Sequence, residues 1–107
     1  MEAASRGAAE AGGLVVALLP TYDKGDANAF AAVVIPTGMG HARNALVASA
    51  GDGVIAVGGR YGTLSEIALA LQLGKPVVGI NTWPGIDGVW RVADAAAAVR
   101  KIASLLK

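Results

Sequence analysis

A strand-to-helix-to-strand pattern over residues 54–80 constrains the fold more than any other feature of this sequence. An apolar, β-branched run at residues 54–57 is followed by a helical pattern at residues 63–73, and a second such run occupies residues 77–80. Two strands joined by a single helix form a parallel pair with a right-handed crossover. The sequence therefore predicts an α/β fold built on a parallel sheet.

Shorter patterns extend this unit toward both ends of the chain. We expect further strands at residues 14–19, 32–35 and 89–92, and further helices at residues 3–11, at residues 41–50 and from the N-cap Asp94 to about Leu106. The helix at residues 63–73 carries its apolar face on Leu64, Ile67, Ala68 and Leu71. This alternation predicts one Rossmann-like domain over residues 1–107, with three layers and a mostly parallel sheet of four to five strands.

The composition excludes several classes of function. The formal net charge is +1 and there is no basic run, so we expect no nucleic-acid partner. The chain has no Cys and a single His, His41, so we expect neither a disulfide nor a metal site.

No apolar run approaches the roughly 18 residues that span a bilayer. With no secretory signal at the N-terminus, we expect a cytoplasmic protein without a membrane partner.

A glycine-rich loop leads from the predicted strand at residues 54–57 into the predicted helix. Backbone N–H groups at such a helix start lack partners and bind anions well. We expect Gly58, Gly59, Arg60, Gly62 and Thr63 of this loop, together with Gly38 from another glycine-rich loop, to bind a small ligand through its phosphate. The alternative is structural: the glycines form only a tight turn, and Thr63 and Glu66 form a capping box.

A second loop, at residues 37–40, follows the predicted strand at residues 32–35. Gly38 and Gly40 imitate the start of a dinucleotide-binding motif, but Arg43 replaces the third glycine, so we exclude NAD as the ligand. Arg43 in the first turn of a helix opposes the helix dipole unless it faces an anion or a carboxylate. Its alternative role is that of a solvated surface side chain.

Two tryptophans, Trp83 and Trp90, flank the loop at residues 84–88. Either ring could stack on a base or a pterin. Covering the edge of the sheet, or forming a subunit contact, is an equally good interpretation of the same residues.

These motifs resemble those of the LOG, or SLOG, superfamily, whose older label is lysine decarboxylase. The sequence GGRYGTLSE, from Gly58 to Glu66, is similar to the family motif PGGxGTxxE, and Arg43-Asn44 stands where the family has Arg-Lys. Residues 37–44 and 58–79 look most like the subgroup that includes the molybdenum cofactor carrier protein. The similarity covers nearly the whole chain, and we expect the domain to lack the family's N-terminal strand-helix-strand.

The resemblance implies one of two functions for the same loop. The family's enzymes hydrolyse the N-ribosidic bond of nucleoside 5′-monophosphates without a required cofactor. Arg43 and Glu66 would then be catalytic, with Glu66 stabilising an oxocarbenium-like state and Arg43 orienting Glu66 or the substrate. In the carrier subgroup the loop would hold the phosphate of a pterin, the molybdenum cofactor, and no bond would break.

We rank binding of a phosphorylated small molecule, a nucleotide, first, with its hydrolysis left open, and carriage of the pterin cofactor second. Lysine decarboxylation is excluded, because the four lysines lie in polar loops or in the last helix, with no setting for a pyridoxal Schiff base.

We also expect a homo-oligomer. A sheet that begins near residue 14 would leave a parallel edge and apolar faces exposed, and such surfaces favour association. The interface is expected on the helix at residues 3–11 or on the apolar sides of the helices at residues 41–50 and 63–73. A two-fold dimer is the simplest closed assembly.

Overall fold

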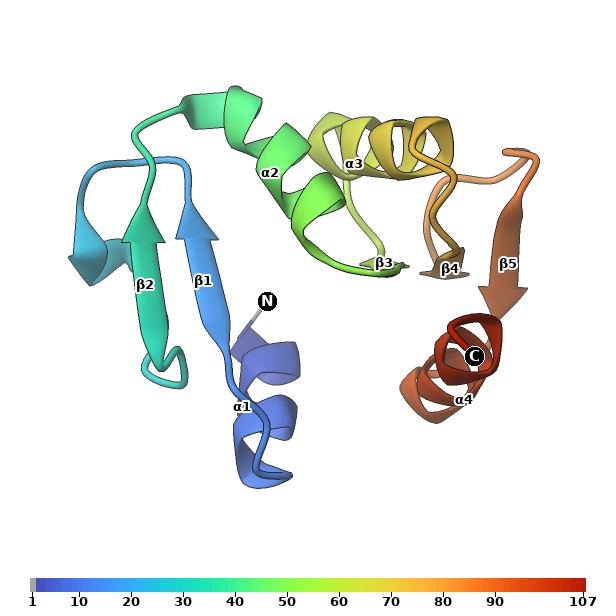
Figure 1. Cartoon of the computed structure of the whole chain (residues 1–107), viewed down its shortest axis with the longest axis horizontal. Coiled ribbons are helices and arrows are strands. Elements are labelled where there is room, and N and C mark those ends of the chain that lie inside the picture. Colours follow the sequence, from blue (N-terminus) through green and yellow to red (C-terminus); the bar gives the residue numbers. More distant parts are fainter. Residues whose placement is uncertain (1) are drawn as a thin grey trace. The chain divides into compact units, whose positions relative to one another are not determined.

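The computed structural model describes residues 2–107, which divide into two compact units, one ending at Arg43 and one running from Asn44 to Lys107. The elements, labelled in Figure 1, are α1 (Glu2–Glu10), β1 (Val16–Leu19), η1 (Lys24–Asp26), β2 (Val33–Pro36), η2 (Gly40–Ala42), α2 (Arg43–Ala50), β3 (Val54–Val57), α3 (Tyr61–Gln72), β4 (Val77–Ile80), β5 (Val89–Val92) and α4 (Ala95–Leu105). The expectation that both units form one domain stays a prediction.

The first unit contains a two-stranded parallel sheet. Strands β1 and β2 pair from Val16 opposite Val33 to Leu19 opposite Pro36. The loop after β2 is fastened to the end of β1, because the hydroxyl of Thr37 donates to the Leu19 carbonyl at 2.6 Å. None of the side chains in α1 is buried. The first strand begins two residues later than predicted, where its pairing with β2 starts.

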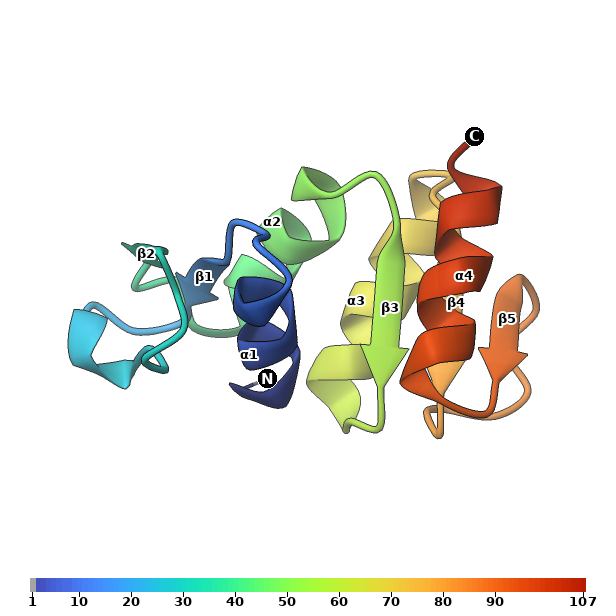
Figure 2. The same cartoon turned by 90° about the horizontal axis from the view of Figure 1, so that it is seen from below.

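The second unit has three layers. Strands β3, β4 and β5 form a parallel sheet in that order. Helix α3 covers one face of this sheet and α4 the other, as Figures 1 and 2 show from two directions. The central strand β4 is buried at Val77, Val78 and Gly79, which suits a parallel strand covered on both faces.

The core of the second unit is built from small and β-branched side chains. Its buried members are Ala48, Ala56, Ile67, Ala70 and Val77. Of the residues predicted on the apolar face of α3, Ile67 is buried, as expected, and the prediction for Ala68 is wrong. Ala68 is exposed, because the buried stripe of α3 runs through Ala70.

The ends of α4 follow the sequence closely. The carboxylate of Asp94 accepts the backbone N–H of Ala97 at 2.8 Å, which confirms Asp94 as the N-cap. The strands predicted at residues 54–57, 77–80 and 89–92 have the predicted bounds. The helix predicted at residues 41–50 begins with the 3-10 turn η2, and α2 follows from Arg43.

The predicted α/β fold is confirmed: residues 2–107 form five strands, all parallel to their partners, and four α-helices. The strands pair as a set of two and a set of three. Among these residues, none of the helices combines the length and the apolar character that crossing a membrane requires.

Truncation of Ile67 should destabilise the second unit. Ile67 is fully buried between α3 and the sheet, so Ile67→Ala leaves a cavity and should lower the free energy of unfolding by about 2–5 kcal/mol. The control Val99→Ala removes methyl groups from a side chain that is 59% exposed and should cost within about 0.5 kcal/mol. Urea denaturation measures both variants, and equal losses would contradict the assigned core.

Candidate functional site

Helix α3 begins at Tyr61, two residues before the predicted start. Its N-cap is Arg60, whose side chain makes no capping hydrogen bond. The first hydrogen bond of the helix joins the N–H of Leu64 to the Arg60 carbonyl at 3.0 Å. Thr63 therefore lies inside the first turn, and the capping box proposed for Thr63 and Glu66 is wrong.

The early start of α3 determines which backbone N–H groups have no acceptor within the helix. The N–H groups of Tyr61, Gly62 and Thr63 precede the first intrahelical hydrogen bond, so they have no acceptor within the helix. The N–H of Gly58, by contrast, donates to the Ile80 carbonyl at 3.0 Å and extends the pairing of β3 with β4. The backbone N–H groups of the first turn of α3 are thus available to an acceptor outside the helix, whereas that of Gly58 is engaged by β4.

Gly59 is the one position in this loop where a side chain has no room. Its φ is +94°, and an added Cβ would lie 1.9 Å from Oγ1 of Thr63. At Gly58, with φ +54°, an added Cβ would meet open space. Gly59 therefore permits the close approach of the loop to the first turn of α3.

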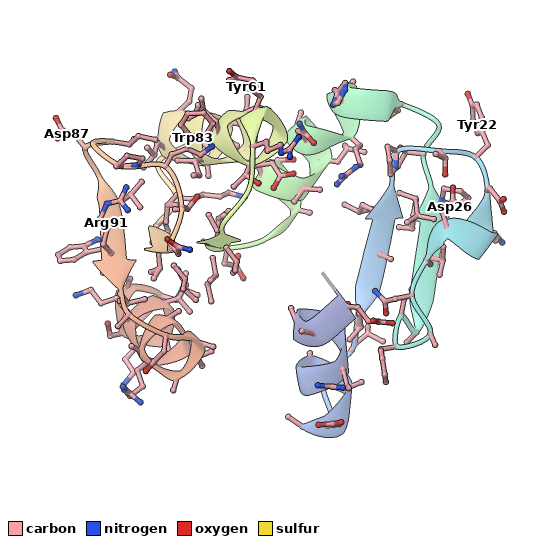
Figure 3. All side chains as sticks on the ribbon, turned by 180° about the vertical axis from the view of Figure 1, so that it is seen from behind. Tyr22, Asp26, Tyr61, Trp83, Asp87 and Arg91 are labelled. Atoms are coloured by element: carbon pink, nitrogen blue, oxygen red, sulfur yellow. The ribbon has the colours of Figure 1, made fainter. Side chains whose placement is uncertain are left out.

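The loop after β4 is joined to the loop after β3 by two hydrogen bonds. The hydroxyl of Thr82 donates to the Gly58 carbonyl at 2.7 Å, and Nε1 of Trp83 donates to the Arg60 carbonyl at 2.8 Å. The rings of Tyr61 and Trp83 have centroids 5.6 Å apart and planes inclined by 34°. Figure 3 labels both side chains.

Arg91, on β5, fixes the same loop from its other side. Its guanidinium donates to the carbonyls of Thr82 and Trp83. Asn81 adopts a φ of +46°, the one positive φ among the non-glycine residues that the structure describes. The loop after β4 is thus hydrogen-bonded both to the loop after β3 and to β5.

These two loops enclose a shallow cavity of about 290 Å³ at the carboxyl end of the sheet. Its lining residues are Gly58, Gly59, Asn81, Thr82, Trp83 and Pro84. Ligands of open α/β folds bind at this end of the strands. The lining includes the backbone of Gly58 and Gly59 and the side chain of Trp83, and the first turn of α3 begins immediately after Gly59 and Arg60.

The structure distributes the predicted site residues over both units. Gly58, Gly59, Arg60, Gly62, Thr63 and Glu66 belong to the second unit, whereas Gly38 and Arg43 belong to the first. Gly38 has a φ of +62°, and the Tyr22 ring occupies the space that a Cβ would take. The pairing of Arg43 with Glu66, which is half-buried on α3, therefore stays a prediction.

The sequence patterns did not single out Asn81, Thr82 or Arg91 as site residues, and Asn44 entered only as part of the motif Arg43-Asn44. Asn44 is 5% exposed, and its amide donates to the Ser65 hydroxyl at 3.2 Å, which joins α2 to α3. One usable signal was present: residues that follow neighbouring parallel strands meet at one edge of the sheet, and Asn81 directly follows β4.

No cluster of three or more acidic or His side chains that could hold a metal ion occurs within residues 2–107.

The chain is similar to known proteins over nearly its whole length. The model of the SLOG cluster4 family matches residues 1–104. An uncharacterized protein of Archaeoglobus fulgidus is 49% identical over 89 residues, which cover 83% of this chain and 58% of that protein. The chain thus spans less than two thirds of the length of this relative.

Two solved structures resemble it closely. The molybdenum cofactor binding protein of the phototrophic bacterium Rippkaea orientalis is 33% identical with a TM-score of 0.90, and the match covers all of this chain and 71% of that one. The molybdenum cofactor carrier protein of Chlamydomonas reinhardtii is 36% identical with a TM-score of 0.81, over 96% and 68% of the two chains.

Removing the Thr82 hydroxyl should loosen the junction between the two loops. Thr82→Val keeps the shape of the side chain but leaves the Gly58 carbonyl without this donor, so the free energy of unfolding should fall by about 1 kcal/mol. Thr82→Ser retains the hydroxyl and should preserve most of that stability. Urea denaturation compares the two variants. A larger loss for Thr82→Ser than for Thr82→Val would show that the methyl group, not the hydrogen bond, matters.

Proposed function

Because the chain belongs to the SLOG cluster4 family, we propose that it binds the molybdenum cofactor, a phosphorylated pterin, as cargo and breaks no bond in it. The names of the two similar structures support this proposal, since one binds and the other carries that cofactor. The ranking derived from sequence alone is thereby reversed: cofactor carriage takes precedence over hydrolysis of nucleoside monophosphates.

One structural observation supports the proposal. The three N–H groups in the first turn of α3 are separated by Arg60 alone from two residues that line the cavity, Gly58 and Gly59. A phosphate bound at this helix start would be stabilised by the N–H groups and by the helix dipole. The remainder of the ligand would then lie in the cavity beside it. Arg60 is exposed and brings a positive charge to the same loop.

The same chemistry also suits a nucleoside monophosphate, which has a phosphate and a flat ring. The test therefore has two arms. In the first, the protein is incubated anaerobically with cofactor released from a molybdoenzyme and is repurified by gel filtration. Pterin is then measured by fluorescence after oxidation, and molybdenum by mass spectrometry. Co-elution of both with the protein is the expected result, and their absence from the protein fraction would refute the proposal.

In the second arm, the protein is incubated with AMP and other nucleoside monophosphates, and the release of free base is followed by chromatography. We expect no release. Release of base that is lost in both Glu66→Gln and Arg43→Ala would instead establish the hydrolase, with Arg43 and Glu66 as its catalytic residues.

Arg60 should strengthen binding through its charge. Because the side chain is exposed, Arg60→Ala should leave the fold intact and weaken binding of the phosphorylated ligand about tenfold, with a smaller dependence of affinity on salt. Arg100→Ala removes the same charge from an exposed position on α4 and serves as the control. Calorimetric titration gives both affinities. Equal weakening in the two variants would show that Arg60 acts only through the overall charge of the protein and makes no specific contact with the phosphate.

We also propose a homo-oligomer. The paired strands β1 and β2 place Val16, Leu18, Val33 and Ile35 on one face, and three of these four side chains are exposed. Burial of such a face would favour association. Light scattering at micromolar concentration should give a mass above that of one chain, which is 10.6 kDa. Val33→Asp together with Ile35→Asp should lower that mass, and a monomeric unmodified chain would refute the assembly.

A further inference from the structure

Trp83 occupies a different environment from the other tryptophan of the chain. Trp83 is half-buried and lines the cavity at the end of β4. Trp90 is 50% exposed on β5, where Nζ of Lys101 lies 3.7 Å from its ring centroid. The sequence leaves the role of both rings open, between stacking on a ligand and covering the sheet. The structure separates them.

The indole of Trp83 is held in position before any ligand arrives. Its Nε1 donates to the Arg60 carbonyl, its own carbonyl accepts from Arg91, and its ring lies against that of Tyr61. Figure 3 shows these three labelled side chains, Tyr61, Trp83 and Arg91, on the same unit. A side chain that is already ordered loses little conformational entropy on binding. Because its N–H is engaged by the loop, the ring offers a ligand mainly its apolar π surface.

The rest of the cavity suits a flat ring. Gly58 and Gly59 contribute backbone but no side chains, and open space surrounds the position of a Cβ at Gly58. A volume of about 290 Å³ lies just below the range of roughly 300–1,000 Å³ that is typical of small-molecule sites. A cavity of this size suits one part of a small ligand, such as a fused ring system.

We propose that Trp83 recognises the ring of the ligand: it stacks on the flat pterin while the first turn of α3 binds the phosphate. This inference rests on the proposed function and adds the residue that selects a ring-bearing ligand. Tyr61, Arg91 and the Arg60 carbonyl position the indole. Trp83 thereby discriminates a pterin phosphate from a phosphate ester that lacks a ring.

The first experiment uses the two-tryptophan composition of the chain. Trp90→Phe leaves Trp83 as the sole tryptophan and leaves the cavity lining intact. Titration of this variant with hydroxymethylpterin monophosphate should produce saturable quenching of the Trp83 emission. Glycerol phosphate, a ring-free ester with a comparable charge, should bind more weakly, as calorimetry measures, and should leave the emission almost unchanged.

The second experiment separates stacking from mere support of the loop. Trp83→Leu should weaken binding of the pterin phosphate about tenfold and leave binding of glycerol phosphate unchanged. Trp83→Phe keeps an aromatic ring but loses the N–H that donates to the Arg60 carbonyl. If stacking is the role, Trp83→Phe should retain most of the affinity for the pterin. Circular dichroism verifies that both variants fold.

The outcomes are distinct. Binding of both ligands without quenching, or an equal loss of both in Trp83→Leu and Trp83→Phe, overturns the stacking role but leaves the phosphate site standing. If neither ligand binds the unmodified protein, the proposed function fails and the inference fails with it. If Trp83→Leu does not fold, the quenching experiment, in which Trp83 is intact, decides the question.

Discussion

Parallel pairing of β3 with β4 is the constraint on which the rest of the second unit depends. Because the two strands run in the same direction and in register from Val54 opposite Val77, their carboxyl ends reach the same edge of the sheet. The loops that follow, distant in sequence, are thus brought side by side. An antiparallel arrangement of the same strands would send the two loops to opposite edges and abolish the cavity.

The contacts between these loops stabilise a site that has few side chains. Thr82 and Trp83 bond to the carbonyls of Gly58 and Arg60, so the glycine-rich segment is held through its backbone acceptors. Its flexibility in the unfolded chain is an entropic cost that these bonds help to offset. A side chain at Gly59 would collide with Thr63, so this glycine is required by the close approach of the loop to α3. The glycines of the loop are therefore compatible with a preformed site.

The cavity presents several groups that can contact a ligand. Its lining contributes backbone, an amide, a hydroxyl, an indole and a proline, none of which acts readily as a general acid or base. These features agree with the carrier function proposed on the basis of the family, in which binding energy and orientation matter and proton transfer does not.

Much of the local structure was determined by sequence alone. The β-branched runs at residues 54–57, 77–80 and 89–92 and the N-cap at Asp94 are encoded by neighbouring residues, so periodicity and capping rules located them. The start of α3 was misplaced, because Thr63 and Glu66 imitate a capping box while the helix begins at Tyr61. Only the tertiary structure decided that Gly58 pairs with Ile80, that Thr82 and Trp83 complete the site, and that Arg91 holds them. Each of these contacts joins residues on different strands or loops, and local propensity carries no information about partners that only folding brings together.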